Sequence, residues 1–118
     1  MGDFILDEVD RIVLGKDKWV DIKHRMSYGD EQKITGHFIR IASMRKALAS
    51  GKATDVDVNI DLESGNILAL LINIKAWNLT GDNGEIASIT EENITRLPRE
   101  YGNKLKDEIN LRNPLPKV

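Results

Sequence analysis

The chain has 118 residues, which is enough for one domain with its own hydrophobic core, and we expect residues 1–118 to form a single domain. It has no cysteine, which excludes disulfides, thiolate catalysis and cysteine-based zinc sites. The net charge of −2 conceals a segregation, because residues 11–52 carry ten bases and four acids whereas residues 53–95 carry eight acids and one base.

This segregation bears on partners. We expect the basic and acidic segments to neutralise each other, within one chain or between the chains of a homo-oligomer. Nucleic-acid binding ranks below this, because the basic residues are dispersed along the chain and lack the interleaved aromatic residues on which bases stack.

The N-terminal part predicts a short β-element. Residues 1–10 are interpreted as an arm or first strand, because Phe4-Ile5-Leu6 is an apolar triplet flanked by acids. Residues 11–14 and 19–23 are β-prone runs, and the glycine-containing connection over 15–18 predicts a β-hairpin. Alternation along the second run turns Val20 and Ile22 inward and leaves Trp19 on the opposite, solvated face.

Two further elements are expected in the middle of the chain. Ser27 is placed to cap a helix that runs to about Ser50, and Gly51 suits its left-handed end. Residues 55–63 alternate polar and apolar, which predicts a strand. From residue 66 to residue 77, nine of twelve residues are apolar, so we expect a buried central helix over about 61–77. This run is too short to span a membrane.

The C-terminal part predicts a turn and two helices. Residues 81–84 have the chemistry of a tight turn in a small hairpin. Thr90 caps a short helix, and Pro98 opens another on which Tyr101, Leu105 and Ile109 share one face. Residues 113–118 form a tail. The predicted fold is α+β, with a small N-terminal β-hairpin and three to four helices packed around the central one.

No pattern announces catalysis. The acids over 55–61 resemble a calcium loop, but Ile60 and Asn66 stand where an EF-hand needs glycine and glutamate. His24 and His37 lie thirteen residues apart and have no partner histidine at helical spacing. We therefore expect no enzymatic activity, no cofactor and no metal site.

One ordered set of motifs resembles a known group. The set comprises Trp19–Lys23, Met26–Asp30, Trp77–Thr80 with the following turn, and Ile89–Leu97. It resembles small proteins encoded in the tail-gene region of long-tailed bacteriophages, which are similar to tail assembly chaperones, over about residues 17–110. Members often carry prolines after the turn glycine, where this chain has residues 85–87.

The resemblance implies a non-catalytic protein of the host cytoplasm. It would act in tail morphogenesis through contacts with tape-measure or tail-tube proteins. The alternative is a structural component of the virion, such as a head–tail connector or tail protein. The candidate partner contacts are four apolar residues of the N-terminal part: Phe4, Ile5, Leu6 and Trp19. The tail over 113–118 is a further candidate surface.

Overall fold

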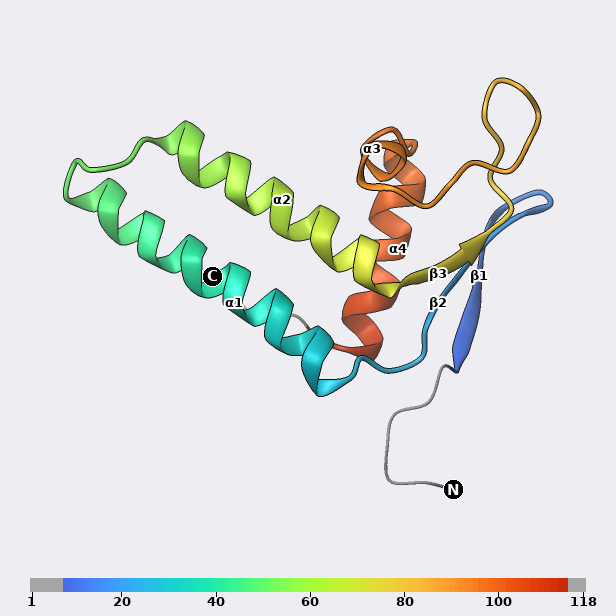
Figure 1. Cartoon of the computed structure of the whole chain (residues 1–118), viewed down its shortest axis with the longest axis horizontal. Coiled ribbons are helices and arrows are strands. Elements are labelled where there is room, and N and C mark those ends of the chain that lie inside the picture. The colour runs from blue at the N-terminus through green and yellow to red at the C-terminus, as the bar shows by residue number, and fades with distance from the viewer. Residues whose placement is uncertain (1–7, 115–118) are drawn as a thin grey trace.

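The computed structural model describes residues 8–114, and the side chains of residues 57–62 also lie outside the description. In this part of the chain, a three-stranded antiparallel sheet combines with four helices (Figure 1). The predicted α+β fold and its N-terminal hairpin are confirmed.

The sheet has the strand order β1-β2-β3, with β1 over Val9–Gly15, β2 over Lys18–Lys23 and β3 over Ile74–Trp77. The hairpin connection is tighter than predicted, because Gly15 already pairs with Lys18 and only two residues make the turn. Asp17 has a φ of 60°, the left-handed conformation that such a turn requires. Val20 and Ile22 are fully buried, as the alternation predicts.

Helix α1 (Tyr28–Ala49) begins and ends where the sequence predicts. The Ser27 side chain accepts a hydrogen bond from the Asp30 backbone N–H, and the Asp30 carboxylate accepts one from the Ser27 N–H. This reciprocal capping box satisfies two backbone donors that the first turn would leave unpaired. Gly51, just beyond the helix, has a φ of 78°.

The prediction of a strand over 55–63 is wrong, because helix α2 spans Asp55–Asn73. An apolar residue at every second position also recurs at every fourth position, so the pattern suits a helix as well as a strand. The predicted central helix over 61–77 therefore begins earlier and ends sooner. Asn73 is fully buried at its end, and its Nδ2 donates to the Ala69 carbonyl over 2.8 Å. The next four residues form β3 instead, where Ile74 and Trp77 are buried against β2.

The core lies between the sheet, the C-terminal half of α2, and the two last helices, α3 (Glu91–Thr95) and α4 (Arg99–Arg112). Helix α4 packs along β1. The predicted inward face of α4 is confirmed at its two buried positions. The buried apolar residues of this cluster are Ile12, Val20, Ile22, Leu70, Ile74, Trp77, Ile94, Leu105 and Ile109.

Helices α1 and α2 pack side by side and project from the core as a helical arm (Figure 1). The arm gives the molecule a radius of gyration of 15.9 Å, against about 13.5 Å for a compact domain of this length. The segments of opposite charge predicted to meet thus adjoin within one chain, since α1 belongs to the basic segment and α2 to the acidic one.

The two helices approach closely at Gly65. A Cβ added there would lie 2.9 Å from Cδ2 of His37 on α1, which is closer than real contacts allow. The sequence drew attention to Gly36 instead, since a glycine inside a helix is unfavourable unless it serves an approach. An added Cβ at Gly36 meets nothing within 4 Å.

These glycines give a matched pair of substitutions. Gly65→Val is expected to lower the free energy of unfolding by about 1–3 kcal/mol, because the added methyl groups push α2 away from α1. Gly36→Val should change it by no more than about 0.5 kcal/mol in the destabilising direction, because the side chain enters open space. Urea denaturation of both variants is the measurement, and equal losses would contradict the close approach at Gly65.

Candidate functional site

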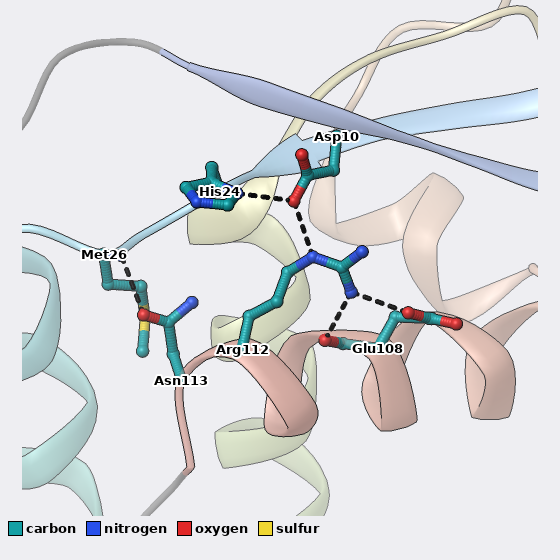
Figure 2. A network of polar contacts seen from close by, with 6 residues as sticks. All are labelled: Asp10, His24, Met26, Glu108, Arg112 and Asn113. Carbon is teal, nitrogen blue, oxygen red and sulfur yellow. Dashed lines mark hydrogen bonds and ion pairs between the residues drawn. The ribbon is translucent and has the colours of Figure 1, made fainter.

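A network of charged side chains joins the last turn of α4 to the sheet (Figure 2). Asp10 Oδ2 accepts a hydrogen bond from Arg112 Nε over 2.7 Å and lies 2.9 Å from His24 Nδ1. Arg112 Nη1 also donates to the carbonyl and the carboxylate of Glu108. Beside this network, Asn113 Oδ1 accepts a hydrogen bond from the Met26 backbone N–H over 3.0 Å.

The network acts on ionisation. The pKa of the Asp10 carboxyl is lowered from its ordinary value of 3.8, chiefly by the hydrogen bond from Arg112 and then by that from His24. Hydrogen bonds to Glu108 and then to Asp10 raise the pKa of the Arg112 guanidinium. The lowered pKa of Asp10 and the raised pKa of Arg112 both favour the ionised forms of this pair. The network therefore holds the end of α4 against the ends of β1 and β2.

Low pH should weaken the stabilising contribution of this network. Because the pKa of Asp10 is lower in the folded than in the unfolded chain, its contribution to stability is present above about pH 4 and is lost as the pH falls through the folded-state pKa. Between about pH 5 and pH 2.5 the urea midpoint of the natural chain should therefore fall further than that of Asp10→Asn. Asp107→Asn, an exposed change on the same helix, should follow the natural chain. Equal falls in all three would show that Asp10 carries no such contribution.

A groove lies at the opposite end of α4, between the loop over 78–90, α3 and the first turn of α4. Its volume is about 430 Å³, which is within the range of about 300–1,000 Å³ for ligand-binding pockets. The lining is part apolar and part polar, and its charged members are two cations and one carboxylate. The lining residues on which the argument depends are Trp77, Leu79, Leu97, Tyr101, Lys18, Arg96 and Asp82.

Backbone anchors shape the loop side of the groove. Asn78 Oδ1 accepts a hydrogen bond from the Trp19 N–H over 2.9 Å, and Asn78 Nδ2 donates to the Asp17 carbonyl over 2.6 Å. The predicted small hairpin follows, with Thr80 and Ile86 bridged across the turn. Gly84 in that turn has a φ of 77°. The loop is therefore tied both to the β-hairpin and to itself.

Trp77 holds the second half of the loop over 78–90 in place. Its Nε1 donates to the Ala87 carbonyl over 2.7 Å while its ring remains buried in the core. The indole thus forms part of the groove floor and part of the hydrophobic core.

Helix α3 provides the other wall. Thr90 caps it as predicted, accepting from the Asn93 N–H over 3.1 Å. The chain then turns at Leu97 and Pro98, and α4 begins with Tyr101 in its first turn. Arg96, between the two helices, forms an exposed ion pair with Glu92 over 3.0 Å. Lys18, across the groove in β2, has no ion-pair partner among the residues that the structure describes.

Of the four predicted contact residues, the structure describes Trp19 alone, and Trp19 is not among the residues that line the groove. Phe4, Ile5 and Leu6 lie outside the described residues. Trp19 lies on the face of the sheet away from the core, where the Arg11 guanidinium covers its ring at 3.6 Å from the ring centroid. Arg11 in turn pairs with Asp21 over 2.9 Å. The face of Trp19 is thus partly covered by its own chain.

Sequence reasoning missed the groove. Of its lining, it singled out Trp77, the turn over 81–84, Pro98 and the inward position of Tyr101, but none of them for a common site. The two cations come from β2 and from the α3–α4 connection, and no local pattern joins them.

Two findings complete the description of the chain. Within residues 8–114, no helix combines the length and the apolar character needed to cross a membrane. No protein-family model, curated protein or solved structure matches this chain.

Proposed function

We propose that this protein is non-catalytic and acts by protein–protein contact in the tail morphogenesis of a long-tailed bacteriophage, as a tail assembly chaperone-like factor of the host cytoplasm. The observation that carries the proposal is a groove with a partly apolar lining and two cations, Lys18 and Arg96, at the junction of β2, the loop over 78–90, α3 and α4. The assignment to phage tails rests on the resemblance of the ordered motifs over residues 17–110.

The groove suits a peptide segment. Leu79, Leu97 and Tyr101 offer partly exposed apolar surface between walls held by backbone hydrogen bonds. Aromatic and apolar anchors seated in such a cleft dominate the binding energy of protein interfaces. Lys18 and Arg96 at the rim favour acidic residues beside those anchors. An apolar run flanked by acids is therefore the segment that we expect a tail-protein partner to present.

A chaperone releases its partner, whereas a structural component remains. We expect deletion of the gene to abolish functional tails while DNA-filled heads still form, and purified virions to lack the protein. Mass spectrometry of the virions is the measurement. Recovery at a fixed copy number would refute the chaperone and favour the structural alternative, a head–tail connector or tail protein.

The groove is tested in the same system. Supplying the deleted gene as Lys18→Glu/Arg96→Glu should restore far fewer tails than the natural gene, because the rim then repels an acidic segment. Lys33→Glu, which reverses an exposed cation on α1 far from the groove, is the control and should restore tails fully. Equal restoration by both variants would remove the groove from the proposal.

A further inference from the structure

We propose that the groove binds residues 3–8 of a second copy of this chain, so that the protein assembles with itself head to tail. The inference rests on the proposed use of the groove as a protein-contact site and names one occupant for it. The geometry that points to it comprises the chemistry of the groove, the place where the described chain begins and the length of chain before that place.

The chemistry of segment and groove is complementary. Residues 3–8 read Asp-Phe-Ile-Leu-Asp-Glu, three apolar residues with one acid before them and two after. The groove offers the partly exposed side chains of Leu79, Leu97 and Tyr101, and Lys18 and Arg96 also line it. Asp82 also lines the groove and Arg96 is paired with Glu92, so Lys18 is the cation that remains available to a segment of charge −3. An apolar anchor between charge-matched flanks fits this site.

Residues 3–8 join the sheet at Glu8, at the end of β1 that lies away from the groove. The Glu8 carbonyl accepts a hydrogen bond from the His24 N–H over 2.9 Å, which fixes the chain at the end of the sheet where Arg112 meets Asp10. The groove lies toward the other end of β1. There, a Cβ added at Gly15 would lie 3.7 Å from the Tyr101 hydroxyl, and Gly15 pairs with Lys18.

The distances decide between one copy and two. Seven residues of strand separate Glu8 from Gly15, which is about 23 Å. Four residues separate Phe4 from Glu8, which is at most about 14 Å when fully extended. Helix α4 packs against β1, with Arg112 at its last turn beside Asp10 and Tyr101 at its first turn in the lining of the groove. The two ends of α4 therefore separate the start of the described chain from the groove. Phe4 therefore falls short of the Lys18 and Tyr101 end of the groove in its own chain, and we infer that a second copy supplies the segment.

The contact that results is heterologous, because the donated segment and the accepting groove lie at opposite ends. Repetition of such a contact closes into a ring or continues as a stack. Every copy then offers one segment and one groove, and the self-associated form keeps the groove occupied until a partner with a similar segment displaces it.

Cross-linking tests the placement directly. The natural chain has no cysteine, so introduced thiols react without interference. A mixture of Leu6→Cys and Thr80→Cys chains should form a disulfide-linked pair under mild oxidation, because Thr80 lines the groove. A mixture of Leu6→Cys and Lys33→Cys chains, with the second thiol on α1, should not. A link formed equally in both mixtures, or in neither, would overturn the proposal.

A mixing experiment tests the energetics. Two full-length variants are used: Phe4→Ser/Ile5→Ser/Leu6→Ser, without an apolar segment, and Lys18→Glu/Arg96→Glu, with a reversed rim. Each alone should self-associate about tenfold more weakly than the natural chain or worse, while its circular dichroism stays unchanged. Mixed together, they should form a pair and no larger species, because one intact segment meets one intact groove.

The outcomes separate this inference from the proposed function. Sedimentation equilibrium that finds no pair in the mixture, or natural association in either variant alone, overturns the head-to-tail contact. Mass spectrometry of purified virions does not depend on self-association, so its result stands in either case. A single chain carrying both Leu6→Cys and Thr80→Cys that closes on itself as a monomer would likewise overturn the assignment to a second copy.

Discussion

Trp77→Ala is expected to lower the free energy of unfolding by about 3–5 kcal/mol, the range for large aromatic residues removed from cores. The indole is 5% exposed and packs in the cluster between the sheet and helices α2, α3 and α4. Its truncation leaves a cavity there and removes the hydrogen bond from Nε1 to the Ala87 carbonyl, 2.7 Å in length. The core and the loop beside the groove should weaken together.

Trp19→Ala is the matched control. This ring lies on the outer face of the sheet and contacts the Arg11 guanidinium. Loss of a partly exposed cation–π contact should lower stability by about 1 kcal/mol. Chemical denaturation of both variants, with the slope of the transition checked for two-state behaviour, is the measurement. A larger loss for Trp19→Ala would mean that the two tryptophans have the opposite roles.

The second large effect is expected in α4. Leu105→Ala should lower the free energy of unfolding by about 2–5 kcal/mol, because its side chain is fully buried. Leu105 and Ile109 are the buried residues by which α4 contacts the core. A cavity at Leu105 removes apolar contacts midway between the charged network at one end of the helix and the groove at the other.

Leu111→Ala provides the control on the same helix. Its side chain is 77% exposed, so truncation should change stability by no more than about 0.5 kcal/mol. Helix propensity is nearly the same for leucine and alanine, which leaves burial as the difference between the two variants. Comparable losses at both positions would contradict the packing of α4 on the sheet.

Much of the fold could be predicted because local chemistry decides it. Alternation alone identifies the inward face of β2, where Val20 and Ile22 are buried. The caps at Ser27 and Thr90 bond to backbone groups three residues away, so their sequence patterns are sufficient. Gly51 likewise marks the end of α1 by its own conformational freedom.

The wrong predictions concern segments whose structure depends on contacts with residues far away in the sequence. Ile74–Trp77 belongs to an apolar run that suits a helix, yet it pairs with β2, more than fifty residues earlier. Residues 55–63 carry a pattern that fits both a strand and a helix, and the packing of α2 on α1 favours the helix. The groove has the same origin, because Lys18 and Arg96 converge on it only after the sheet and α4 have assembled.

The projecting arm divides the molecule into regions of unequal cooperativity. Helix α1 is joined to the rest mainly through α2, and its fully buried residues are Ile34 and Ile41. Local opening from the tip at Gly51 therefore exposes little apolar surface, whereas opening near the sheet disrupts the core. We expect amide hydrogen exchange to be fastest at the tip and to slow progressively along both helices toward the sheet. The outer turns of the arm can then unfold and refold while the sheet, the groove and the charged network remain intact.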